Sequence, residues 1–140
     1  MSADWNRIQR TCVNLIENAI RFSPVGGEIY IKARKKKVSE LGRHVLVTID
    51  DQGTGIDKEK QSLIFEKFYT TGSRNGNERR GVGLGLTFSK LVVEAHGGCI
   101  CVESPYKTAD SQEVQGCRFR FWIPVTNGAD HLLAVEASNE

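Results

Sequence analysis

Asn14, Asn18 and Arg21 are the residues whose types and spacing first suggest chemistry. They recur at i, i+4 and i+7, so in a helix they share one stripe. Asparagine and arginine are poor choices for a plain exposed face, where glutamate and lysine favour the helix more. One interpretation is a row of amide oxygens and a guanidinium directed at phosphates and a hydrated Mg²⁺. The alternative is a solvated face made of mediocre helix formers.

A second candidate is the glycine-rich stretch Gly81-Val82-Gly83-Leu84-Gly85-Leu86. Glycine lets the backbone take unusual conformations and approach a ligand closely. The stretch runs directly into a helical pattern, and the N–H groups and dipole of a helix N-terminus suit a phosphate. The order matches neither of the common phosphate-binding motifs. The alternative is a glycine-rich turn before a core helix.

A carboxylate at the end of a predicted strand is the third candidate. Asp51 opens the segment Asp51-Gln52-Gly53-Thr54-Gly55-Ile56, which is either a tight turn or a place where a purine amino group could donate to an acceptor. Residues 69–80 have no apolar period and resemble a mobile lid. The arginines of this lid could reach phosphates or only keep the segment in solution.

Two helices and a set of strands must position these residues. The range 5–22 has the strongest helical pattern, and its predicted core stripe is Trp5, Ile8, Cys12, Leu15, Ile16 and Ala19. The helix after the glycines is predicted to bury Leu84, Phe88, Leu91, Val92 and Ala95. Asp57 is predicted to cap a short helix that carries Leu63, Ile64, Phe65 and Phe68.

Alternation predicts four strands, near residues 29–34, 45–50, 99–103 and 117–123. The first two form a hairpin, and the first is expected to be half-buried. Its inward residues are predicted to be Ile29, Ile31 and Ala33, and those of the last strand Cys117, Phe119, Phe121 and Ile123. Residues 104–116 are predicted to loop out.

The composition is that of a globular domain. The chain has 140 residues, with 19 Lys and Arg against 17 Asp and Glu, a balance that argues against nucleic acid as a partner. The basic run Arg34-Lys35-Lys36-Lys37 is interpreted as a solvated hairpin end. No apolar window reaches the ~18 residues of a membrane span, so we expect no direct membrane contact and a cytoplasmic location, although a soluble piece of a membrane receptor would look the same.

The four cysteines contain no C-x-x-C pair. Cys99 and Cys101 would share one face of a strand and are interpreted as core residues, because thiols are readily buried and no cluster completes a metal half-site. We expect all four thiols to be free.

Four segments in one order resemble a known family, the sensor histidine kinases. Asn14 to Pro24 resembles the N box, Asp51 to Ile56 the G1 box, Ile64 to Phe68 the F box, and Gly81 to Leu86 the G2 box. The resemblance covers nearly the whole chain. It implies the catalytic ATP-binding domain of a two-component histidine kinase, in the wider GHKL ATPase group.

The implied fold is α+β, a two-layer α/β sandwich. In this Bergerat fold a mixed, mostly antiparallel sheet packs on about three helices, and a flexible lid covers the nucleotide. The resemblance implies a catalytic domain over residues 1–125 whose leading strands are truncated, followed by a tail over 126–140.

The resemblance also implies a role for each matched residue. Asn18 would hold Mg²⁺ with help from Asn14, Arg21 would contact phosphate, and Phe22 would pack near the adenine. Asp51 would accept from the adenine amino group. The nucleotide pocket would be completed by Gly53, Gly55, Ile56, Gly81, Val82, Gly83, Leu84, Gly85, Leu86 and Cys117. Cys117 stands where the family usually has a threonine whose hydroxyl helps bind adenine, a change that weakens binding modestly.

The implied activity is transfer of a phosphoryl group from Mg-ATP to a histidine on a separate helical dimerisation domain of the same parent kinase, with a response regulator downstream. None of His44, His96 and His131 lies in such a helix. The alternatives are an ATP-hydrolysing enzyme of the gyrase or Hsp90 sort, an anti-sigma-type serine kinase, and a non-catalytic nucleotide sensor. The hydrolases carry a water-activating glutamate at the position of Asn14.

Overall fold

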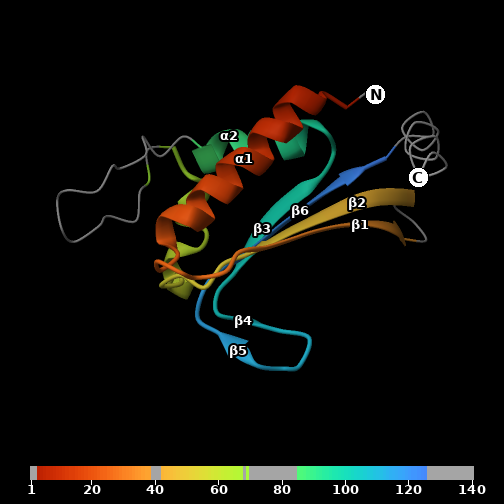
Figure 1. The fold of residues 1–140 in the computed structure, drawn as a ribbon. Helices are drawn as coiled ribbons and strands as arrows, with labels where there is room; N and C mark the ends of the chain where they lie inside the picture. The colour runs from red at the N-terminus through yellow and green to blue at the C-terminus, as the bar shows by residue number, and fades with distance from the viewer. Residues whose placement is uncertain (1–2, 39–41, 68, 70–84, 126–140) are drawn as a thin grey trace.

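The structure has two layers, a four-stranded antiparallel sheet with helices on one face (Figure 1). It is a computed structural model, and it describes residues 3–38, 42–67, 69 and 85–125. The predictions for Phe68, the segment 70–84 and the tail 126–140 lie outside this range. The α/β sandwich predicted from the family resemblance is confirmed.

The regular elements follow the predicted order. They are α1 (Trp5–Phe22), β1 (Tyr30–Val38), β2 (Gly42–Asp50), the 3-10 turns η1 (Lys58–Lys60) and η2 (Leu63–Phe65), α2 (Gly85–Ala95), β3 (Cys99–Glu103), β4 (Tyr106–Lys107), β5 (Glu113–Val114) and β6 (Arg118–Pro124). Neither α1 nor α2 is long and apolar enough to cross a membrane.

The sheet has the order β1-β2-β6-β3, and each neighbouring pair is antiparallel. Its register pairs Ile49 with Phe119 and Val47 with Phe121. A separate hairpin, β4 with β5, extends beyond the sheet (Figure 1). The segment that was predicted only to loop out therefore contains this hairpin.

The core lies between the sheet and the two helices. α1 supplies Leu15 and Ala19, which are fully buried, and α2 supplies Val92 and Val93. They pack on the inward side chains of β2, β3 and β6, which are Ile49, Ile100, Phe119, Phe121 and Ile123. The Phe65 ring meets Phe119 edge-on. The predicted inward face of the last strand is therefore correct.

Ile29 packs against the core as predicted, but the expected burial of Ile31 and Ala33 and the expected core position of two cysteines are wrong. Along β1, Ile31 is 53% exposed and Ala33 is also exposed, because β1 is the sheet edge and the helices contact β2, β3 and β6 instead. Cys99 and Cys101 are exposed. Alternation in β3 gives the helix-facing position to Ile100, which turns both thiols to the opposite face.

Two further predictions of burial are wrong. Trp5 is 56% exposed, because it begins α1 and the buried stripe starts one turn later, at Ile8. In α2 the buried line is Ser89, Val92 and Val93, whereas Leu91 and Ala95 are exposed. The Ser89 hydroxyl can be buried because it donates to the oxygen of Gly85 one turn earlier.

The predicted cap of the short helix is also wrong. Asp57 makes no side-chain capping hydrogen bond, and the chain forms η1 and η2 in place of one helix. Ile64 is nevertheless buried in the core, as the sequence predicts.

We predict that Leu15→Ala lowers the free energy of unfolding by about 2 to 5 kcal/mol, because it leaves a cavity in a fully buried site. The matched control is Leu91→Ala, which removes the same atoms from an exposed site on α2 and should change stability by no more than about 0.5 kcal/mol. Urea denaturation of both variants measures the difference. Equal losses would contradict the observed orientation of α2.

Candidate functional site

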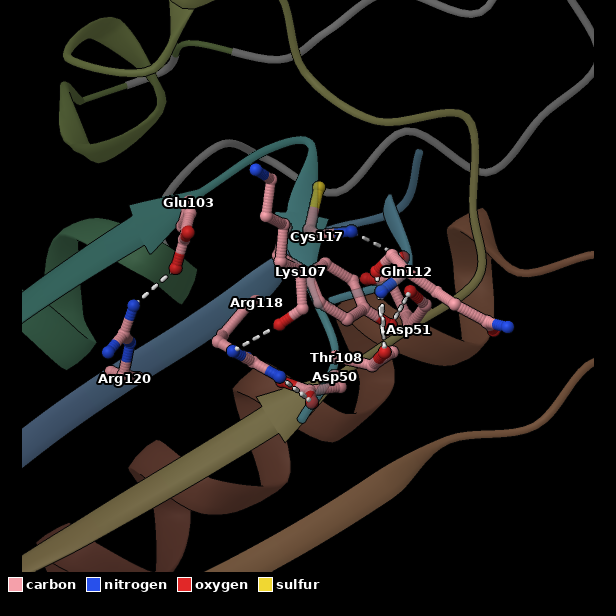
Figure 2. Close-up of polar contacts among 10 residues, drawn as sticks. Asp50, Asp51, Glu103, Lys107, Thr108, Gln112, Cys117, Arg118 and Arg120 are labelled. Carbon is pink, nitrogen blue, oxygen red and sulfur yellow. Dashed lines mark hydrogen bonds and ion pairs between the residues drawn. The ribbon is translucent and has the colours of Figure 1, made fainter. Parts of the chain in front are cut away.

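Asp51 lies at the centre of the candidate site. It follows β2 directly, and its side chain is buried, with 2% exposure. One carboxylate oxygen, Oδ1, accepts from the main-chain N–H of Gly53 at 2.8 Å and of Cys117 at 3.1 Å. The bond to Cys117 is visible in Figure 2. The described residues provide no donor to the other oxygen, Oδ2.

Burial dominates the electrostatics of this carboxylate. Desolvation raises the pKa of Asp51 above its ordinary value, while the N–H donors of Gly53 and Cys117 limit the rise and the nearby Asp50 adds to it. The neighbouring thiol responds to the same surroundings, because burial and the charge of Asp51 raise the pKa of Cys117 to about 11. Cys117 is therefore a neutral, buried thiol at physiological pH.

The main chain of Asp51 is also fixed. Its N–H donates to the oxygen of Cys117 at 2.9 Å, and its oxygen accepts from the Tyr106 hydroxyl at 2.9 Å. Gly116 allows this contact, since a Cβ there would lie 1.9 Å from the oxygen of Asp51. Asp51 thus cannot move without breaking its bonds to Cys117, just before β6, and to Tyr106 of β4.

The loop after Asp51 is hydrogen-bonded to residues 104–116, the segment that contains the β4–β5 hairpin. The N–H of Ile56 donates to the Ser104 hydroxyl at 2.9 Å, and that hydroxyl donates to the oxygen of Gly116 at 2.8 Å. Gln61 bridges the two segments by donating to the oxygens of Ile56 and Ser104. The loop is therefore fixed to Ser104 both directly, through Ile56, and through the side chain of Gln61.

Two glycines of this loop are required by close approach. A Cβ on Gly53 would lie 2.6 Å from the main-chain oxygen of Phe22, at the end of α1. Gly55 has a φ of +78°, and a Cβ there would lie 2.3 Å from the oxygen of Gln115. The structure thus brings Phe22 and Gly53 together and fits the Gly55 turn against the segment before β6.

The polar stripe of α1 lies beside the start of α2. Asn14 and Asn18 are half-buried, and Arg21 is exposed. The Asn14 amide donates to the oxygen of Gly85 at 3.4 Å, a contact between residues 71 positions apart. The structure records no hydrogen bond or ion pair of Asn18 or Arg21 with another described residue. Gly81, Val82, Gly83 and Leu84 lie outside the described range, and Leu86 is half-buried against the core.

The side chains of this stripe suit Mg²⁺. Amide oxygens are hard ligands of the kind this ion accepts, and Mg²⁺ usually takes one or two protein oxygens together with phosphate oxygens and water. Since the Asn14 amide donates through its nitrogen, its oxygen is left for another partner. The described residues contain no cluster of three His, Cys, Asp or Glu side chains that could hold a metal by themselves.

Comparison with known proteins decides the family. The model of the histidine kinase-, DNA gyrase B- and HSP90-like ATPases matches residues 3–127. The chain belongs to this ATPase family. The resemblance seen in the sequence is therefore confirmed.

The relatives of this ATPase domain are sensor kinases. Sensor protein KdpD of Clostridium acetobutylicum is 40% identical over 124 residues, which are 89% of this chain and 12% of that protein. The mycobacterial sensor histidine kinase MprB superposes with a TM-score of 0.69 at 29% identity, covering 87% of this chain and 72% of that structure. Full-length ShkA in complex with AMPPNP superposes with a TM-score of 0.66 at 27% identity, covering 87% of this chain and 22% of that structure. The chain is thus a histidine-kinase-type ATPase domain that spans a small part of its curated relative.

Sequence reasoning missed the residues that hold the Asp51 loop of this ATPase domain. Ser104, Tyr106 and Gly116 lie about fifty or more positions from the loop. Their bonds join side chains to main-chain atoms and follow no local periodicity. The one available signal was Tyr106 itself, a large aromatic residue in a stretch that otherwise read as a polar loop.

We predict that Tyr106→Phe lowers the free energy of unfolding by about 1 to 3 kcal/mol, because it leaves the buried oxygen of Asp51 without its donor. The control is Tyr30→Phe, which removes a hydroxyl whose bond to Glu28 is exposed and which should cost little. Chemical denaturation of the two variants separates the effects. If both lose the same stability, the Tyr106 hydroxyl does not hold the loop.

Proposed function

We propose that residues 1–125 bind Mg-ATP and transfer its γ-phosphoryl group to a histidine on a separate helical dimerisation domain of a parent sensor kinase. A response regulator would then receive the signal. The observation that carries the proposal is the half-satisfied Asp51 carboxylate, with Oδ1 occupied by two main-chain donors and Oδ2 left for a ligand. The AMPPNP in the ShkA complex supports a nucleotide as that ligand.

The adenine side of the proposed pocket is formed by Asp51 and its loop. A buried carboxylate oxygen discriminates strongly for an amino group, since a ligand without that donor leaves the oxygen unpaired. Gly53 and Gly55 keep the loop free of side chains at its closest approaches. Phe22 and Ile56 are half-buried at its edge and supply apolar surface for the ring. Cys117 contributes its main-chain N–H to Asp51 and a neutral thiol in place of a hydroxyl.

The phosphate side is formed by α1 and the segment that enters α2. The contact between Asn14 and Gly85 joins the two regions that the sequence singled out for phosphate. Arg21, one turn beyond Asn18 and exposed, would contact a phosphate oxygen. Residues 81–84 would contribute main-chain N–H groups to the phosphates.

The amide oxygen of Asn18, with that of Asn14, would hold Mg²⁺ in this proposal. The ion supplies neutralisation of the charge that develops on the phosphate oxygens. Asn14 and Asn18 keep their positions because the residues between and beside them, Leu15 and Ala19, are anchored in the core.

The residues favour transfer over hydrolysis. Phosphoryl transfer requires positioning and charge neutralisation more than covalent help from the protein. Hydrolysis requires a base that activates water, and an amide such as Asn14 cannot serve as one. The nearest carboxylate, Glu17, is exposed and lies about 60° around the helix from Asn14.

The described histidines are not suited to be phosphoacceptors. His44 is buried in β2 with its ring near Trp122. His96 follows α2, where Nδ1 donates to the oxygen of Val92 and Nε2 accepts from the N–H of Asp4. His44 is thus enclosed and His96 has both ring nitrogens occupied by hydrogen bonds, which supports an acceptor on another domain.

We predict that Asp51→Asn abolishes ATP binding measurable by calorimetry. The amide lacks the negative charge of the carboxylate, and it can direct an N–H donor at the adenine amino group, which needs an acceptor. The loss of one buried acceptor is worth about 1 to 3 kcal/mol. The control is Asp50→Asn, the same change one residue earlier. Asp50 pairs with Arg118 on the other face of the sheet, so this variant should retain ATP binding. Unchanged affinity in Asp51→Asn would refute the adenine assignment.

We also predict that the chain incubated alone with radiolabelled Mg-ATP gains no label on histidine. Addition of a helical dimerisation domain from a sensor kinase of this type should produce label on that domain, and Asn18→Ala should abolish it. Acid-labile label on His44 or His96 would contradict the separate acceptor. Rapid steady release of phosphate without any acceptor would favour the hydrolase alternative.

A further inference from the structure

The sheet face opposite the helices carries a basic groove. Its volume is about 300 Å³, and its floor consists of Leu46 and Thr48 of β2. Most of the other lining residues are cationic, and they are Lys32, Arg34, Lys36, Lys107, Arg118 and Arg120. We call this site the outer-face groove.

Strand register explains why these charges gather. Lys32 lies opposite Thr48, which lies opposite Arg120, and Arg34 lies opposite Leu46. Since side chains alternate along a strand, Lys32, Arg34 and Lys36 of β1 all point to the face away from the helices. Lys107, at the end of β4, adds a cation from the hairpin side (Figure 2).

Protein carboxylates neutralise only part of this charge. Arg118 makes a two-point ion pair with Asp50, at 2.8 Å for each bond, and Arg120 pairs with Glu103. The structure records no ion pair between Lys32, Arg34, Lys36 or Lys107 and another described residue. In addition, Nε of Arg120 is enclosed without a hydrogen-bond acceptor. The groove therefore has positive charge that the described carboxylates do not neutralise.

We propose that the outer-face groove docks an acidic segment of a protein partner in extended conformation. Side chains at alternate positions of an extended chain repeat at about 6.6 to 6.8 Å, the same repeat that separates Lys32, Arg34 and Lys36 along β1. Carboxylates at every second position of the partner would thus meet the three cations in register. The Nη1 N–H groups of Arg120, for which the structure records no acceptor among the described residues, would donate to one of them.

The charge distribution favours an acidic protein segment over a nucleic acid. The row on β1 covers only about 13 Å between its ends, and the two arginines on β6 are already paired with Asp50 and Glu103. The chain as a whole has a net charge of only +2, so it lacks the extended positive field that attracts a phosphate backbone.

The outer-face groove is separate from the proposed nucleotide site. The helices α1 and α2 lie on the other face of the sheet (Figure 1), and the Asp51 loop meets the end of α1, where Gly53 lies against Phe22. The docking proposal therefore does not depend on ATP binding, and each can fail without the other.

A pair of charge reversals on one strand tests the proposal. The probe is a fluorescein-labelled peptide of four Glu-Thr repeats, and its binding to the full chain is measured by fluorescence anisotropy at about 0.15 M salt, where charges more than about 8 Å apart are largely screened. Lys32→Glu with Lys36→Glu should weaken binding at least about tenfold. The matched control is Lys35→Glu with Lys37→Glu, which changes the same charge on the same strand but on the opposite face, and its affinity should stay within about twofold of the unmodified chain.

Other outcomes would overturn the proposal. Equal loss in both double variants would show that β1 attracts the peptide by net charge alone, or that its lysines only protect a sheet edge. Absence of binding by the unmodified chain would overturn it directly. So would tighter binding of an octathymidylate or of anionic phosphatidylserine vesicles than of the peptide. Thermal denaturation and ATP calorimetry of each variant confirm that fold and nucleotide site are intact.

Discussion

The buried Asp51 carboxylate is the interaction on which the rest of the site depends. A charged group this enclosed is costly to bury unless hydrogen bonds compensate it, and here the compensation comes from a main-chain donor of its own loop and from that of Cys117, just before β6. The arrangement fixes one oxygen and leaves the other for a ligand. The surrounding loop is then held to residues 104–116 by hydrogen bonds of Ser104, Tyr106 and Gln61. The Asp51 loop is thus held in place by bonds within the protein.

Sequence reasoning predicted the elements well and the contacts between them poorly. The bounds of α1 and the inward face of β6 could be predicted because both follow from the spacing of apolar residues along the chain, which is a local property of the sequence. Periodicity could not show that β1 is an edge or which face of β3 carries Cys99, because strand order and covering helices are properties of the whole fold. It also misjudged α2, where Ser89 is buried in place of Leu91 through a bond to its own helix. Of the site, the structure brings Asn14 beside Gly85, two residues that sequence reasoning had assigned to the phosphate side, whereas the supporting bonds from Ser104 and Tyr106 have no sequence pattern.

The two faces of the sheet have different chemistry and, in our proposals, different roles. The covered face holds the core and presents the Asp51 loop and the polar stripe of α1 at one end. The open face holds ion pairs and surplus lysines that no helix covers. Asp50 and Asp51 are adjacent yet serve opposite faces, since one pairs with Arg118 and the other lies in the loop. Substitutions on one face of the sheet can therefore be tested while the contacts of the other face stay intact.

A crystal structure of the chain with Mg²⁺ and a non-hydrolysable ATP analogue tests the central claim most directly. The exocyclic amino group of adenine should lie within hydrogen-bond distance of Oδ2 of Asp51, while Oδ1 keeps its bonds to the N–H groups of Gly53 and Cys117. An adenine bound elsewhere, or an Asp51 carboxylate that contacts only protein in the complex, would contradict the role assigned to this residue.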